Sequence, residues 1–184
     1  MRTPISLAFV AALALTATTP LLAAESSALP VPGYPAAQDV PGAHELPDPT
    51  IDYKVVFSIG SGAKDMTAEV NPRLAALARY VNTLAKYGVP AEKRHLIVMF
   101  HQRNDDFEIT LTNEAFKARH GKDNPNIALI HSLAAAGVQF RACGQAVVGR
   151  KLDASEINPD IQVDLWAMTS MLNLQMKGYV RTGN

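Results

Sequence analysis

The sequence predicts an α/β fold with three layers, α/β/α, around a mostly parallel sheet of about five strands. Two observations lead to this prediction. Short runs rich in β-branched and aromatic residues alternate along the chain with segments whose apolar residues recur at helical spacing. The run HLIVMFH at residues 95–101 is apolar throughout its middle, which is typical of a strand covered on both faces. Such alternation joins parallel strands through helices that pack on both faces of the sheet.

The first strand and the first helix of the folded part are marked at both ends. The run YKVVFSI at residues 53–59 is a strand that stops at a Gly-Ser-Gly turn. A helix is expected over residues 71–88, because apolar side chains recur there at helical spacing. Asn71 can cap this helix, Pro72 suits its first turn, and Gly88 suits its end.

The middle of the chain repeats this order of strand and helix. Residues 95–101 are the second strand, and a short helix is expected near 113–120 within a polar segment. Residues 124–137 repeat the earlier signals: an Asn cap, a Pro at the first helical position, an apolar stripe and a Gly stop. Residues 138–143, VQFRAC, form the third strand.

The last part of the chain supplies the remaining elements. One or two helical turns follow residue 143, and IQVDL at 161–165 is a fourth strand. Residues 166–178 form a helix that ends at a glycine, and YVRT at 179–182 forms a last short strand. The helix over 166–178 is apolar on more than one face and begins at a tryptophan. We therefore expect it to serve both the core and a contact between subunits.

The N-terminus reads as a secretory signal peptide over residues 1–24. Arg2 gives a short positive region, and the apolar run at 5–15 has the length of a secretory segment rather than of a membrane span. An uncleaved anchor is the alternative. No cysteine lies near the cleavage site, which excludes a lipoprotein anchor. The prediction is a periplasmic protein with no membrane span after signal cleavage.

Residues 25–50 are rich in proline, alanine and serine and show no apolar periodicity. This composition favours an extended chain, either a linker or an arm that lies on the surface. Residues 51–184 then form one domain, since nothing in the later sequence marks a second one.

Composition excludes several classes of protein. The 184 residues carry a formal net charge of zero, whereas a nucleic-acid binder usually shows a basic excess on one face. The five histidines form no HxxxH pair, so no metal site is expected. We also expect no cofactor, because the Gly-Ser-Gly turn matches neither dinucleotide-binding nor phosphate-loop spacing.

The candidate site lies where three predicted strands end. Cys143 follows the third strand, His101 the second, and Gly60 and Ser61 the first. Because the carboxyl ends of parallel strands meet at one edge of a sheet, these residues are expected together there. A single cysteine in an exported chain also points to a free thiol or to an intermolecular bond.

The residues around Cys143 favour a reactive thiolate. The backbone N–H groups of Gly144 and Gln145 open a helical turn next to the sulfur, and Arg141 shares its strand face. These features predict an accessible, ionised thiol. The alternative is a small buried apolar residue. His101 is either a hydrogen-bonding partner of the thiolate or a solvated residue at the end of its strand.

Residues 124–147, in the order of a helix, Gly-Val, a strand and then Cys-Gly-Gln, resemble the DsrE/DsrF-like sulfur-relay family, in its small single-domain branch. A helix ending in Gln-x-x-Gly-Tyr, here Gln175 to Tyr179, is a second similarity, and the resemblance spans residues 52–181. It implies a three-layer α/β/α fold and assembly as a trimer or hexamer. It also implies that the cysteine matched by Cys143 carries sulfane sulfur as a persulfide, with His101 at a histidine common in that branch. Relay members are cytoplasmic, whereas this chain carries an export signal.

The sequence thus supports an exported sulfur carrier, a sulfurtransferase-like protein rather than a turnover enzyme, with sulfur donor and acceptor proteins as partners. Two alternatives stay open: an oligomeric binding module in which Cys143 is structural, and a protein that forms mixed disulfides with a partner thiol. The expected site comprises Cys143 and His101 as reacting residues and, as binding residues, Gly144, Gln145, Arg141, Gly60 and Ser61.

Overall fold

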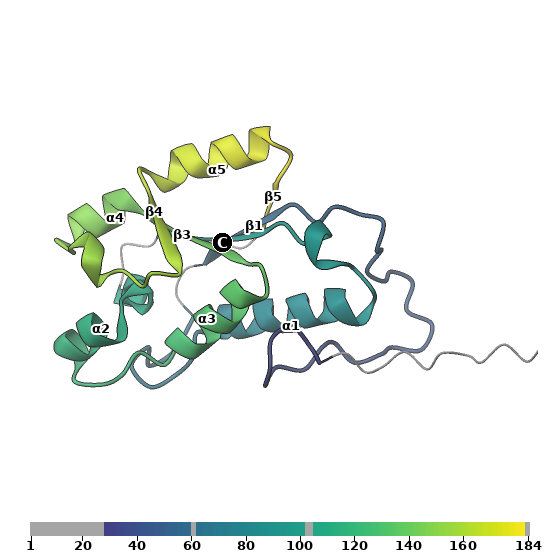
Figure 1. The fold of residues 1–184 in the computed structure, drawn as a ribbon, viewed down its shortest axis with the longest axis horizontal. Coiled ribbons are helices and arrows are strands. Elements are labelled where there is room, and N and C mark those ends of the chain that lie inside the picture. Colours follow the sequence, from purple (N-terminus) through teal and green to yellow (C-terminus); the bar gives the residue numbers. More distant parts are fainter. Residues whose placement is uncertain (1–27, 60–61, 102–104, 183–184) are drawn as a thin grey trace, which may run out of the picture.

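Five parallel strands form one sheet in the order β4-β3-β2-β1-β5 (Figure 1). They are seen in a computed structural model that describes residues 28–59, 62–101 and 105–182. The strands are β1 (Val55–Ile59), β2 (Leu96–Phe100), β3 (Gln139–Cys143), β4 (Ile161–Asp164) and β5 (Val180–Thr182). The prediction of a parallel sheet of about five strands is confirmed.

Helices lie on both faces of this sheet. They are α1 (Pro72–Lys86), α2 (Asn113–His120), α3 (Ile127–Ala135), α4 (Gly144–Gly149) and α5 (Ala167–Met176), with short 3-10 helices η1 (Ala91–Lys93), η2 (Asp105–Thr110) and η3 (Ala154–Glu156). Figure 1 shows α1 and α3 on one side of the sheet and α5 on the other. The three-layer α/β/α arrangement is therefore confirmed.

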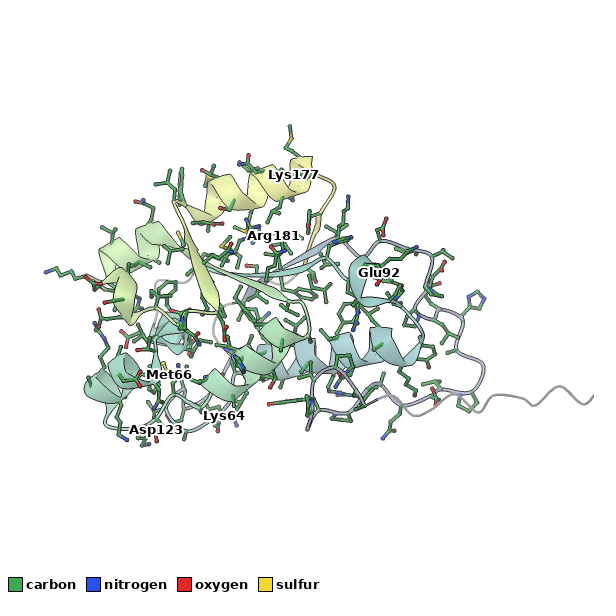
Figure 2. The ribbon with its side chains drawn as sticks, in the orientation of Figure 1. Lys64, Met66, Glu92, Asp123, Lys177 and Arg181 are labelled. Carbon is green, nitrogen blue, oxygen red and sulfur yellow. The ribbon has the colours of Figure 1, made fainter. Side chains whose placement is uncertain are left out.

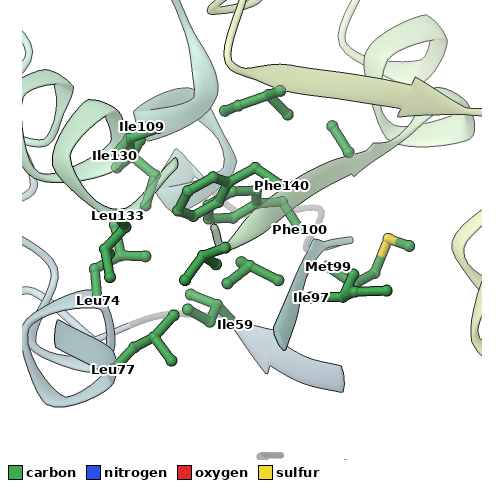
Figure 3. Close-up of a cluster of buried hydrophobic side chains, with 14 of the residues drawn as sticks. Ile59, Leu74, Leu77, Ile97, Met99, Phe100, Ile109, Ile130, Leu133 and Phe140 are labelled. Carbon is green, nitrogen blue, oxygen red and sulfur yellow. The ribbon is translucent and has the colours of Figure 1, made fainter. Parts of the chain in front are cut away.

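The main core lies between the sheet and the layer of α1 and α3. Phe100 and Phe140 come from neighbouring strands and stack with their ring centroids 6.1 Å apart. Figure 3 shows these rings facing leucines and isoleucines of the two helices, whereas Ile97 and Met99 point to the opposite side of the sheet. Because side chains alternate along a strand, β2 is buried on both of its faces.

The described part of the Pro-rich segment lies along α1. Asn82, inside this helix, is fully buried and accepts a hydrogen bond from the N–H of Val31 at 2.9 Å. Its amide donates to the carbonyls of Val31 at 2.8 Å and Tyr34 at 2.7 Å. A salt bridge of 2.7 Å between Lys86 and Asp39 adds a contact farther along. This arm therefore pairs several of its backbone groups with side chains of the helix.

The second Asn-Pro signal was interpreted wrongly. We expected Asn124 to cap a helix with Pro125 at its first position, but α3 begins at Ile127 after Asn126. The buried Asn124 side chain instead donates to the backbone carbonyls of Ile109 and Leu111, at 2.9 and 3.0 Å. Its Oδ1 still accepts the N–H of Asn126 at 3.0 Å, so the local contact is made just before α3, while the amide satisfies the buried carbonyls.

Helix α5 connects the two edges of the sheet. Strands β4 and β5 lie at opposite ends of the strand order, so the chain between them has to cross one face of the sheet (Figure 1). The helix buries Ala167 and Leu174 and leaves most of its other side chains partly or fully exposed. Among the described residues, no helix has the length and apolar character needed to cross a membrane.

Candidate functional site

The sheet face beneath α5 brings together polar residues from several strands. In the strand register, Ser58 of β1 and Arg141 of β3 are both partners of Met99 in β2. Partners in a parallel sheet share a face, and so do residues two positions apart along a strand. His101 and Cys143, two residues beyond Met99 and Arg141, therefore lie toward the same face at the carboxyl edge.

Cys143 lies beneath the start of α5. The cysteine is only 5% exposed, so the expectation of a solvent-facing thiol is wrong. Its Sγ accepts a hydrogen bond from the backbone N–H of Ala167, the first residue of α5, at 3.3 Å. This N–H has no partner inside its own helix, so the sulfur occupies the place of a capping group.

Gly144 and Gln145 hold the segment between β4 and α5 against Cys143. A Cβ on Gly144 would lie 2.7 Å from the carbonyl oxygen of Asp164 and 3.1 Å from that of Leu165. Only glycine allows this close approach. The side chain of Gln145 donates to the carbonyl of Leu165 at 3.2 Å. Within the described residues, the N–H that donates to Sγ is therefore that of Ala167 in α5 and not that of Gly144 or Gln145. These two residues instead contact Asp164 and Leu165, in the segment that leads to α5.

His101 is fixed by a buried serine. The Oγ of Ser58 lies 2.5 Å from Nε2 of His101, and Ser58 is only 1% exposed. Burial of the imidazole lowers the pKa of His101 below 6.5, and the positive charge of Arg181 lowers this pKa further. His101 therefore stays neutral to a lower pH than an exposed histidine does.

A cavity of about 300 Å³ opens between α5 and this edge of the sheet, and both His101 and Cys143 line it. Arg181, from the last strand, contributes the guanidinium group (Figure 2). The remaining wall is formed by Gln145, Ala146, Trp166, Ala167, Met168, Met171, Leu172 and Gln175. Sequence reasoning brought Cys143 and His101 to this place but missed Ser58, Ala167 and Arg181.

Comparison with known proteins assigns the family. Residues 54–180 match the DsrE/DsrF-like family, which covers more than half of the chain. The chain belongs to this family. The expected resemblance is thus confirmed.

Other comparisons add less about the DsrE/DsrF-like chain. A search of curated proteins found no match. Among solved structures, the chain is similar to MTH1491 from Methanobacterium thermoautotrophicum, described as a protein of unknown function. The two are 19% identical with a TM-score of 0.46, over 71% of this chain and 100% of the other.

The remaining predicted binding residues lie apart from the cavity or outside the described residues. Arg141 pairs with Asp164 of the adjacent strand at 3.5 Å, and both side chains are largely buried. The guanidinium of Arg141 in this DsrE/DsrF-like domain therefore faces the neighbouring strand, and Arg141 does not line the cavity. Gly60 and Ser61 lie outside the described residues. Within the part of the chain that the structure describes, three or more metal-ligating side chains do not gather anywhere.

Proposed function

We propose that this DsrE/DsrF-like protein is an exported sulfur carrier that holds sulfane sulfur as a persulfide on Cys143. The observation that carries the proposal is the position of the sulfur, on a residue that lines a cavity and beneath the N–H of Ala167. An N–H donor and the positive end of a helix stabilise a thiolate more than a neutral thiol. The thiolate is the form that attacks sulfur.

The proposed transfer needs no outside oxidant. The Cys143 thiolate attacks the outer sulfur of a donor R–S–S⁻ and forms a new S–S bond. The S–S bond of the donor breaks, and its electron pair leaves with R–S⁻. The transferred sulfur then extends into the cavity, which His101 also lines as a neutral imidazole.

Mass spectrometry of the intact protein tests this proposal. After incubation with a sulfane-sulfur donor, the wild type is expected to gain the mass of one sulfur atom on Cys143. A Cys143→Ser variant keeps the N–H of Ala167 satisfied by a hydroxyl and should gain nothing. A wild-type thiol that stays unmodified with persulfide, polysulfide and thiosulfate donors would rule the carrier function out.

A second function is favoured by the burial of the same residue. With Cys143 only 5% exposed and its sulfur already hydrogen bonded, the thiol also fits a structural role in an oligomeric ligand- or protein-binding module. That role predicts slow alkylation of Cys143 in the native protein. It also predicts that a Cys143→Ala variant loses stability but keeps its binding function. Fast alkylation at neutral pH would instead support the carrier.

Export and assembly are part of the proposal. Residues 1–24, which lie outside the described residues, have the composition of a cleaved signal peptide and direct the chain to the periplasm. Sequencing the N-terminus of the mature protein from a periplasmic extract tests this, with Glu25 expected first. Self-association is supported by apolar side chains exposed on α5. Trimers or hexamers are the expected form, and sulfur donor and acceptor proteins the expected partners.

A further inference from the structure

Among the residues that the structure describes, the lining of the cavity beside Cys143 contains one guanidinium and no carboxylate. Arg181 lines it with an exposed guanidinium, and the recorded lining includes neither aspartate nor glutamate. In the described part of the chain, Arg181 forms no salt bridge. Its charge also disfavours protonation of His101. A guanidinium that lacks a carboxylate partner is suited to bind the carboxylate of a ligand.

Much of the lining that α5 contributes to the cavity is apolar. Four side chains at the start and along one side of α5 form this wall: Trp166, Met168, Met171 and Leu172. Such side chains favour carbon over water and add nothing to the binding of a small inorganic anion. The lining thus fits a molecule that has both a hydrocarbon part and an anionic group.

We propose that the cavity binds a small organic persulfide that carries a carboxylate, with Arg181 holding the carboxylate and the α5 wall holding the carbon chain. This inference rests on the proposed function and names the class of its sulfur donor. A volume of about 300 Å³ is at the lower end of small-molecule sites. Since Cys143 is only 5% exposed, a donor that enters the cavity reaches it more directly than one held on a protein surface.

Within this site the outer sulfur of R–S–S⁻ faces Cys143 while its carboxylate stays on Arg181. The Cys143 thiolate forms a bond to the outer sulfur, the S–S bond of the donor breaks, and R–S⁻ departs with the electron pair. Charge and atoms balance, because one thiolate and one persulfide anion give another persulfide anion and another thiolate. Arg181 binds donor and released thiol alike, so it governs which donors load the protein.

The first test compares two donors that differ only in charge. N-acetylcysteine hydropersulfide carries the carboxylate, and its methyl ester does not. With the wild type we expect the acid to load Cys143 about tenfold faster than the ester. This ratio corresponds to the free energy of one hydrogen bond to a charged group, which the ester cannot form with Arg181. In Arg181→Gln, the rate with the acid should fall to that of the ester, and the rate with the ester should stay unchanged.

Lys177→Gln is the matched control for this experiment. Lys177 is an exposed cation at the end of α5 and does not belong to the recorded cavity lining (Figure 2). Its removal should leave both rates as in the wild type. The proposal is overturned if Arg181→Gln retains the preference for the acid. It is also overturned if thiosulfate, which has no carbon chain, loads the wild type as fast as the acid does.

A second measurement separates this inference from the proposed function. In a Cys143→Ser background, the dissociation constant of N-acetyl-S-methylcysteine, an unreactive thioether, is measured by calorimetry with and without Arg181→Gln. We expect binding about tenfold weaker without the arginine. If the thioether binds with this dependence on Arg181 but no donor loads the wild type, the carrier function alone is contradicted. Loading without any dependence on Arg181 would contradict the carboxylate site alone.

Discussion

His101 is held between a buried serine and a positive charge, and this sets its behaviour with pH. Its pKa lies below 6.5, because burial disfavours the imidazolium and Arg181 repels it. As the pH falls through 6.5, the unfolded chain takes up a proton on this histidine before the folded chain does. Folding therefore loses stability from about pH 6.5 down to the folded-state pKa. Above pH 6.5 the contribution is complete.

An NMR titration of the His101 ring tests these two causes separately. The wild type should titrate with a midpoint below 6.5, and Arg181→Gln should raise that midpoint while leaving it under 6.5 because burial remains. Lys177→Gln should leave it in place. The loss of thermal stability between pH 7.5 and 5.5 should also be smaller in His101→Gln than in the wild type. An unchanged midpoint in Arg181→Gln would contradict the role given to the arginine.

The rule that strand ends meet at one edge of a sheet was sufficient to predict that Cys143 and His101 lie near each other. The rule gave no way to find Ala167 or Arg181. Ala167 reaches the sulfur because α5 returns over the sheet, and Arg181 reaches the cavity because β5 pairs with β1. Both facts depend on the order of strands, which local sequence patterns do not encode.

At the scale of elements, the junction between β3 and α4 depends on one glycine. A Cβ at position 144 would lie 2.7 Å from the carbonyl oxygen of Asp164, a backbone atom that cannot turn aside. The loop leading to α5 would have to move, and the N–H of Ala167 would move with it. Overpacking of this kind costs about 3 kcal/mol, near the upper end of the usual range.

Gly144→Ala is therefore expected to lower the free energy of unfolding by about 3 kcal/mol and to change the alkylation rate of Cys143. Gly149→Ala is the control at the other end of α4, because a Cβ there meets no atom within 4 Å. Chemical denaturation measures the first effect, and mass spectrometry of alkylated protein measures the second. Equal stability of the two variants would show that the close approach at Gly144 does not matter.

Local signals were enough to predict the strands and helices, but not the partners of every residue in them. The Asn71 cap of α1 follows the local rule, and its side chain accepts the N–H of Arg73 at 2.9 Å. Asn124, with the same Asn-Pro signal, accepts the N–H of Asn126 at 3.0 Å in the same way, but its amide also donates to the buried carbonyls of Ile109 and Leu111. The oxygen makes a contact with a near neighbour, whereas the amide binds carbonyls 15 and 13 residues away, which the local signal does not reveal.

At the scale of the molecule, α5 and the residues before it gather several exposed apolar side chains of the described chain. Met168, Leu172 and Met176 are spaced four residues apart on this helix, and Leu165 and Trp166 precede it. Side chains four apart lie on one side of a helix, so the three form a row. Met168 and Leu172 also line the cavity. A second copy packed on this row would therefore narrow the entrance to Cys143.

We expect the protein to be an oligomer in solution that Met176→Lys converts largely to monomer. Met176 is 89% exposed, so a lysine there costs the isolated chain little, whereas a charge buried between copies would be unpaired. Val40→Lys is the control, since Val40 is a similarly exposed apolar residue, 67% accessible, on the N-terminal arm. Light scattering after size exclusion gives the mass of each variant. A monomeric wild type, or a Met176→Lys variant of unchanged mass, would remove α5 as the contact. If instead Met176→Lys is monomeric and its Cys143 is alkylated faster, the contact between copies also controls access to the sulfur.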